Sequence, residues 1–203
     1  EGEAERERIH GTPGPRWFER DTPIALVHGD AAMFVGGIRA VMMQSLHPVA
    51  MAAVADHSGF RGDLWGRLAR TATFLATTTF GPEVHAQATI DRVRRVHDHV
   101  TGTTPDGTPY IASDPHLLAW VHAAEMDSFL SAHQAYGHRR LDAAGRDEYL
   151  AQTAVVAAKL GVIDPPTTEA ALREVLAAFR PELKGTPVAR EAMDFVRLQP
   201  PLA

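Results

Sequence analysis

The chain has 203 residues, of which 45% are hydrophobic, and its formal net charge is -5. This length supports one sizeable core, so we expect a single domain over residues 1–203, with a motif-bearing part at about 11–160 and C-terminal helices at 167–199. The acidic balance and the lack of a long basic run argue against a nucleic-acid partner. The absence of cysteine excludes disulfides, thiolate metal sites and Cys-linked haem, so any haem would be bound non-covalently.

The sequence as given carries no sign of a targeting or membrane segment. Its first residues alternate in charge without an apolar run, so no signal peptide is visible. The longest apolar stretch, at about 31–55, is interrupted by four residues: Arg39, Gln44, His47 and Pro48. These interruptions favour a buried core helix over a membrane span. We therefore expect no transmembrane segment and a cytoplasmic location.

Apolar periodicity of about 3.6 residues dominates every long segment, which predicts an all-α fold of about seven or more helices. We expect a first long helix from Asp30 to Asp56, kinked or divided at Pro48. Two further core helices are expected at 63–80 and 82–100, followed by a turn or small hairpin within 101–113. Gly, Pro and Asp residues typical of helix ends mark the limits of four later helices, which we expect at 115–136, 142–160, 167–179 and 187–198.

The helix expected at 82–100 places a histidine on an apolar face. That face carries, at helical spacing, Ile90, Val93, His97 and Val100, and the opposite face carries Arg92, Arg95 and His99. This pattern predicts that His97 is a buried ligand. The alternative is a core histidine satisfied by hydrogen bonding, which is the commoner case when the residues alone are considered.

The preceding helix carries a second chemically unusual face. Its members are Arg67, Arg70, Thr71 and Phe74. A buried guanidinium is costly unless it meets an anion, a carboxylate or a polar cofactor edge, so we expect a cofactor pocket between this face and His97. The alternative is that Arg67 only joins two helices through an ion pair, with Asp56 or Asp63 as its partner.

Other histidines have alternative roles. We expect His47 and His57, on either side of the end of the first long helix, to be structural. His122 and Glu125 lie one turn apart and could form an internal pair, or join His47 and His97 in a non-haem metal centre. A di-iron carboxylate bundle needs paired Glu-x-x-His motifs, and the chain offers only the reverse order, once, so the metal centre is less favoured.

Seven motifs occur in order within residues 11–160. They are Gly36-Gly37-Ile38-Arg39-Ala40, Gln44-Ser45-Leu46-His47-Pro48, Asp56-His57-Ser58-Gly59-Phe60, Gly66-Arg67-Leu68-Ala69-Arg70-Thr71, Arg95-Val96-His97, Pro109-Tyr110-Ile111-Ala112, and Asp114-Pro115 with Trp120-Val121-His122. As an ordered set, they resemble the family that includes the bacterial latex clearing proteins (rubber oxygenases) and the membrane-bound MpaB oxygenase of mycophenolic acid biosynthesis.

The resemblance implies an all-helical, globin-reminiscent domain that holds a b-type haem and uses dioxygen to cleave carbon–carbon double bonds in isoprenoid chains. It places His97 at the position of the iron ligand. It places Arg67 and Thr71 on the other side of the haem. Neutral imidazole on an apolar helix face is a normal axial ligand, which agrees with this assignment.

The chain departs from the latex clearing proteins at two points. They carry a lysine that can cap the distal iron face, where this chain has Arg70, which stays protonated and is a poor iron ligand. They also use a glutamate base near the distal pocket, and this chain has no glutamate between Asp30 and Glu83. We therefore expect a small apolar substrate in preference to polyisoprene.

We accordingly predict a haem b-dependent oxygenase whose partners are dioxygen and a small apolar, isoprenoid-like substrate. In the predicted site, His97 is the iron ligand, the catalytic residues are Arg67, Arg70 and Thr71, and Phe74 lines the cofactor pocket beside Arg67 and Thr71. The alternatives are a non-catalytic haem- or lipid-binding helical protein and a non-haem His/Glu metal protein. The sequence leaves the oligomeric state open, a homodimer included.

Overall fold

The computed structural model describes residues 2–57 and 60–198, apart from the side chains of 60–64 and 197–198. The structure is 72% helical, and its described part contains ten α-helices and one two-stranded antiparallel sheet. The prediction of an all-α fold with at most a small hairpin is confirmed.

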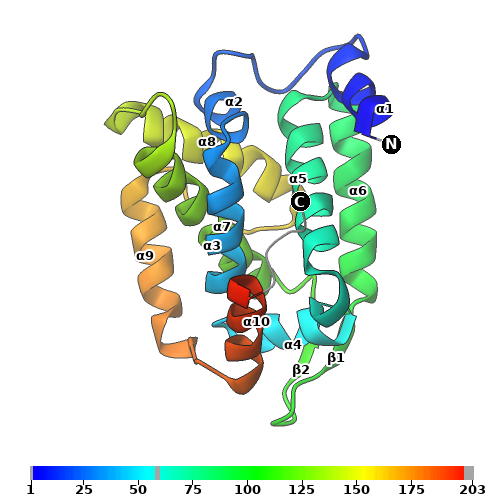
Figure 1. Cartoon of the computed structure of the whole chain (residues 1–203), viewed down its shortest axis with the longest axis vertical. Coiled ribbons are helices and arrows are strands. Elements are labelled where there is room, and N and C mark those ends of the chain that lie inside the picture. The colour runs from blue at the N-terminus through cyan, green and yellow to red at the C-terminus, as the bar shows by residue number, and fades with distance from the viewer. Residues whose placement is uncertain (1, 58–59, 199–203) are drawn as a thin grey trace.

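Figure 1 shows the arrangement of these elements. The helices are α1 (Gly2–Arg6), the π-helix η1 (Glu7–Gly11), α2 (Pro23–His28), α3 (Ala32–Gln44), α4 (Pro48–His57), α5 (Phe60–Phe80), α6 (Glu83–His99), α7 (Pro115–Tyr136), α8 (Ala143–Leu160), α9 (Glu169–Phe179), the 3₁₀ helix η2 (Arg180–Glu182) and α10 (Pro187–Leu198). Strands β1 (Thr101–Thr103) and β2 (Pro109–Ile111) pair between α6 and α7, with Gly102 opposite Tyr110.

Helix α7 is the central element of the bundle. It begins as the sequence predicts, because the Asp114 side chain accepts a hydrogen bond from the His116 backbone N–H and Pro115 occupies the first helical position. Twelve of its residues are buried, among them Trp120, Phe129 and His133. A helix that is apolar on most sides is stable only when neighbours surround it, and here α2, α3, α4, α8 and α9 pack against it.

The first long helix is divided rather than kinked. Helix α3 ends at Gln44, α4 begins at Pro48, and their axes differ by 108°. The His47 side chain accepts a hydrogen bond from the Ala50 backbone N–H at 3.3 Å, which satisfies one of the donors at the start of α4. In the described residues, no single helix is both long enough and apolar enough to cross a membrane. Helices α3 and α4 taken together have the length and composition of a membrane span, but they are bent sharply at the break between them.

Helices α5 and α6 form an antiparallel pair that flanks α3 and α7 (Figure 1). Gly81 and Pro82 separate them, as predicted, but α5 begins at Phe60, three residues before the expected start at Asp63. The short helices α1, η1 and α2 were not predicted. They have too few turns for a periodic signal, and contacts distant in sequence fix them, such as the bond from the Ile24 backbone N–H in α2 to Gln152 Oε1 at 2.8 Å.

Close contact between α3 and α7 depends on Gly36. A Cβ atom at this position would lie 3.0 Å from Phe129 Cδ1, 3.1 Å from Phe129 Cα and 3.3 Å from the Ser128 carbonyl oxygen. Backbone atoms cannot move aside as a flexible side chain can. Gly36→Ala is therefore expected to push the two helices apart and to lower the free energy of unfolding by about 1–3 kcal/mol.

Gly37→Ala is the matched control, because a Cβ there would meet only Leu68 Cδ2, at an ordinary 3.7 Å. This variant should keep or slightly raise stability, since alanine favours the helix by roughly 0.5–1 kcal/mol over glycine. Urea unfolding of both variants measures the difference. Equal stability of the two variants would contradict the close-packing role of Gly36.

Candidate active site

A cavity of about 420 Å³ lies among α3, α5, α6 and α7. Most of its lining is apolar, including Ala40, Val41, Val54, Leu68, Phe74, Val93, Val96, Val100, Val121, Phe129 and Leu160. A second, smaller cavity of about 140 Å³ shares part of this wall, including Arg67 and His97, and extends to Met51, Leu117 and Ala192. The larger volume falls within the ~300–1,000 Å³ that is typical of small-molecule sites.

The structure brings all the residues of the predicted site to this cavity. The larger cavity is lined by Arg67, Arg70, Thr71, Phe74 and His97. The first four come from α5 and the last from α6, so the two helix faces that the sequence singled out meet across one space. Arg70 is exposed at the cavity edge, whereas Arg67 is partly buried.

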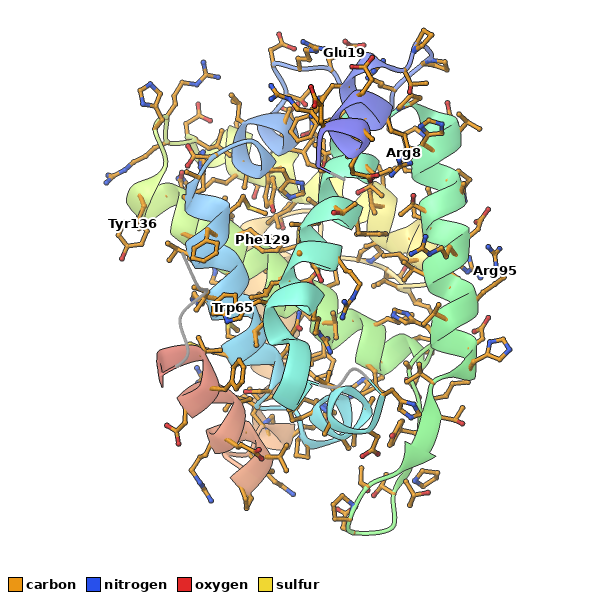
Figure 2. The ribbon with its side chains drawn as sticks, turned by 45° about the vertical axis from the view of Figure 1, so that its right-hand side comes forward. Arg8, Glu19, Trp65, Arg95, Phe129 and Tyr136 are labelled. Atoms are coloured by element: carbon orange, nitrogen blue, oxygen red, sulfur yellow. The ribbon has the colours of Figure 1, made fainter. Side chains whose placement is uncertain are left out.

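His97 lies on the inner face of α6. Arg95, two residues earlier, projects from the outer side of the helix (Figure 2). The Nδ1 atom of His97 is buried and has no hydrogen-bond partner in the described part of the chain. Burial, and then the nearby charge of Arg67, lower the pKa of His97, so the ring is neutral at neutral pH.

Unpartnered buried nitrogens indicate missing partners, because nearly all buried polar groups are hydrogen-bonded. Within the described residues, four partly or fully buried histidines carry such a nitrogen: His85, His97, His122 and His133. Of these four, His97 is the one that lines the larger cavity. His97 therefore offers a neutral imidazole at the wall of this cavity.

Arg67 introduces a positive charge into the same space. Burial lowers the pKa of its guanidinium, and the carboxylate of Glu125 acts in the opposite direction. An arginine stays protonated in such surroundings, so the cavity wall carries a permanent cation. Asp56, one of the expected partners, accepts a hydrogen bond from the Tyr110 hydroxyl at 2.6 Å, and the Asp63 side chain lies outside the described residues.

Glu125 is the residue of the cavity that sequence reasoning missed. It projects from α7 and accepts a hydrogen bond from Gln44 Nε2 at 3.1 Å. Burial raises its pKa to about 6, although Gln44 and the charge of Arg67 act to lower it. A carboxyl group with such a pKa can exchange a proton near neutral pH, which is what a general acid or base requires.

The expected pair of His122 and Glu125 is wrong. His122 Nε2 is buried without a partner in the described chain, whereas Glu125 is bonded to Gln44. The sequence did mark Glu125 as unusual, since an acidic residue in the middle of an apolar helix needs a hydrogen-bond partner nearby. Its spacing from His122 suggested the wrong one.

The remaining histidines do not join the cavity as a metal centre. His57 Nε2 bonds to the Thr101 carbonyl oxygen at 2.9 Å and links α4 to β1, in agreement with a structural role, and it also reaches the cavity lining. His47 lies beside His116 and Glu182 instead of converging with His97 and His122. His47 therefore does not join His97 and His122 in the shared metal centre that the sequence offered as one alternative.

The fold and this cavity define a mostly helical protein with a largely apolar, partly open ligand site. Residues 26–203 match the family described as ER-bound oxygenase mpaB/B'/Rubber oxygenase, catalytic domain. The match covers most of the chain, so the chain belongs to this oxygenase family, and the predicted resemblance is confirmed. No curated protein and no solved structure matched significantly. Membership supports oxygenase activity, with an organic substrate and dioxygen as reactants.

Proposed function

We propose that this protein is a haem b-dependent oxygenase that cleaves a carbon–carbon double bond in a small, apolar, isoprenoid-like substrate. The observation that supports the proposal most strongly is the position of His97, whose partly buried, neutral imidazole lines the 420 Å³ cavity together with Arg67 and Thr71. Family membership supports the oxygenase part of the proposal.

The residues of the cavity fit a haem group. The neutral imidazole of His97 provides the iron ligand, and the apolar walls suit the faces of the macrocycle. Arg67 and Arg70 supply cationic groups for the two propionates or for polar atoms at the iron. Bound haem would supply the activation of dioxygen, which protein side chains cannot perform.

Cleavage of an alkene by one molecule of dioxygen gives two carbonyl products, so atoms and electrons balance without a further reductant or a net proton. The side chains then have two tasks. Glu125 accepts and returns a proton at its carboxylate, which its pKa of about 6 permits. Arg67 donates hydrogen bonds to oxygen atoms on which negative charge develops, in a cavity whose walls are largely apolar.

The smaller cavity supports a short substrate. Its volume of about 140 Å³ is close to that of an engineered ~150 Å³ apolar protein cavity that binds benzene. Its lining includes Met51, Val54, Leu117 and Ala192, with few polar atoms. A segment of about one isoprene unit fits this space beside the larger cavity, whereas a polymer would need a continuous channel.

Replacing Arg67 by leucine is expected to slow oxygen-dependent alkene cleavage by about 100-fold, because removal of one preorganised donor typically costs this much. The acidic limb of the pH–rate profile should also move to higher pH, since Arg67 helps to keep the pKa of Glu125 down. Haem content should change little. Rates are measured with a short unsaturated isoprenoid and corrected for bound haem.

Arg95→Leu is the matched control, because this side chain is exposed on the outer side of α6. It should leave the rate and the pH–rate profile unchanged. If Arg67 only joins helices, Arg67→Leu will lower the melting temperature of the apo and haem-loaded protein equally and leave the rate unchanged. That result would remove Arg67 from the catalytic machinery. Haem binding without oxygen consumption by the unmodified protein would indicate a binding protein instead.

A further inference from the structure

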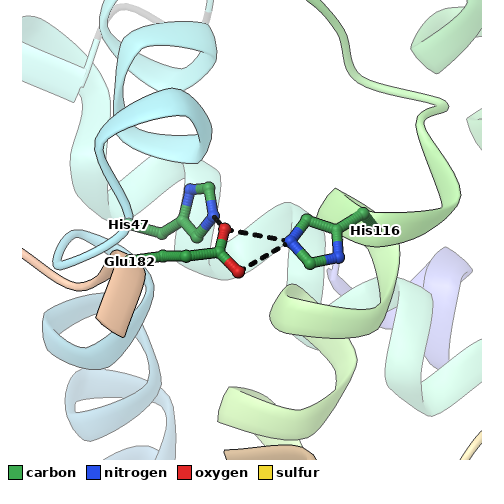
Figure 3. A group of neighbouring side chains, drawn as sticks. All are labelled: His47, His116 and Glu182. Atoms are coloured by element: carbon green, nitrogen blue, oxygen red, sulfur yellow. Dashed lines mark hydrogen bonds and ion pairs between the residues drawn. The ribbon is translucent and has the colours of Figure 1, made fainter. Parts of the chain in front are cut away.

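Three polar side chains from separate parts of the chain converge near the start of α7. His47 comes from the turn between α3 and α4, His116 from the first turn of α7, and Glu182 from η2 (Figure 3). They are distant in sequence, and none of them lines the two cavities described above. The proposed haem site therefore does not use them.

The three side chains point their ligand atoms at a common region. His47 Nε2 lies 3.2 Å from Glu182 Oε2, and His116 Nε2 lies 2.9 Å from the same oxygen and 3.0 Å from Oε1. One ligand atom from each residue lies within 4.8 Å of the others. A tetrahedral zinc ion with ligands at ~2.0–2.1 Å separates its ligand atoms by about 3.3 Å, so the observed spacing is close to that of a metal site.

We propose that His47, His116 and Glu182 form a binding site for a divalent transition metal of the zinc type, with three protein ligands and one open position for water. Two imidazoles and one carboxylate are a donor set that suits Zn²⁺ and its neighbours in the first transition row. The side chain of His47 is 3% exposed, whereas those of His116 and Glu182 are 56% and 41% exposed. The site thus has a buried anchor and a side that is open to an entering ion.

The chemistry of the cluster suits a cation. Glu182 supplies an acidic group that lies against two imidazoles, from His47 and His116. One carboxylate and two imidazoles are ligand types that hold zinc in three-ligand sites.

Binding requires the ring proton to move at both histidines, because each donates its Nε2 proton to the Glu182 carboxylate, which can only accept. At His47, Nδ1 accepts the Ala50 backbone N–H at 3.3 Å, so without metal the ring proton resides on Nε2. When Nε2 binds a metal, the proton must reside on Nδ1, and the long bond from Ala50 is lost. We therefore expect moderate affinity, and the metal should fasten η2 and α7 to the turn before α4.

The test uses the full chain, stripped of metal with a chelator and titrated with Zn²⁺ by calorimetry. We expect one equivalent to bind with a dissociation constant in the micromolar range or below, and bound Zn²⁺ should raise the melting temperature. His116→Ala and Glu182→Gln should each weaken binding at least tenfold. Both residues are partly exposed, so these variants should fold even if His47→Ala does not.

Two control variants make the result specific. His138→Ala removes an exposed histidine outside the cluster and should bind Zn²⁺ as the unmodified chain does. His97→Ala removes the proposed haem ligand and should also retain the Zn²⁺ site, which separates this proposal from the proposed oxygenase function. The proposal is overturned if the chain binds no Zn²⁺, or if His116→Ala and Glu182→Gln bind it as tightly as the unmodified chain.

Discussion

His97→Ala is expected to abolish the Soret absorption band of the haem-reconstituted protein while leaving the helical circular dichroism largely intact. The reason is that the imidazole is the only expected bond between the protein and the iron. The site offers no cysteine, because the chain has none, and Arg70 at the cavity stays protonated and is a poor iron ligand. Removing His97 from its partly buried position also leaves α6 in place, since Ile90 and Ala86 anchor that helix in the core.

His99→Ala is the matched control for this prediction. His99 lies two residues further along α6, is exposed, and bonds through Nδ1 to the Arg95 carbonyl oxygen at 2.6 Å. Its removal should leave the Soret band unchanged. Equal loss of the band in both variants would point to general destabilisation of α6, and an unchanged band in His97→Ala would remove this residue as the iron ligand.

Local signals were sufficient to predict most of the fold. Asp142 and Thr168 cap α8 and α9 with side-chain hydrogen bonds to backbone N–H groups, and Gly161 ends α8 in the left-handed region with φ of 109°. Such residues act within one turn of the helix end, so a single sequence contains the necessary information. The short N-terminal helices depend on distant contacts instead, and they were missed.

The same distinction applies to the site. The faces of α5 and α6 could be predicted because each helix has one polar and one apolar side, so the position of His97 follows from helical spacing. Helix α7 is buried on most sides, and no polar stripe marks which side of it meets the cavity. Glu125 was therefore paired with the wrong neighbour. The cluster of His47, His116 and Glu182 depends on tertiary structure alone, because 135 residues separate its first and last members.

The protein without added haem is expected to lose stability steeply as the pH falls from 7 to 5, because burial keeps several histidines neutral, His28 and His122 most strongly. Burial lowers the pKa of His28 to about 3 and that of His122 to about 4. In the unfolded chain, both would take up protons near pH 6.5. Below that pH the unfolded state binds more protons than the folded state, so the free energy of unfolding falls until the folded-state pKa values are reached.

From pH 7 to pH 5, the two histidines together should cost about 3–4 kcal/mol of unfolding free energy. Glu125 acts in the opposite direction, because its pKa of about 6 is raised above the unfolded value, and its protonation should offset about 1 kcal/mol over the same range. Urea unfolding at pH 7, 6 and 5 measures the net loss. His122→Gln should remove about half of the histidine contribution, whereas the exposed His138→Gln should leave the slope unchanged. A pH dependence that is identical in the unmodified chain and in His122→Gln would show that His122 does not resist protonation in the folded state.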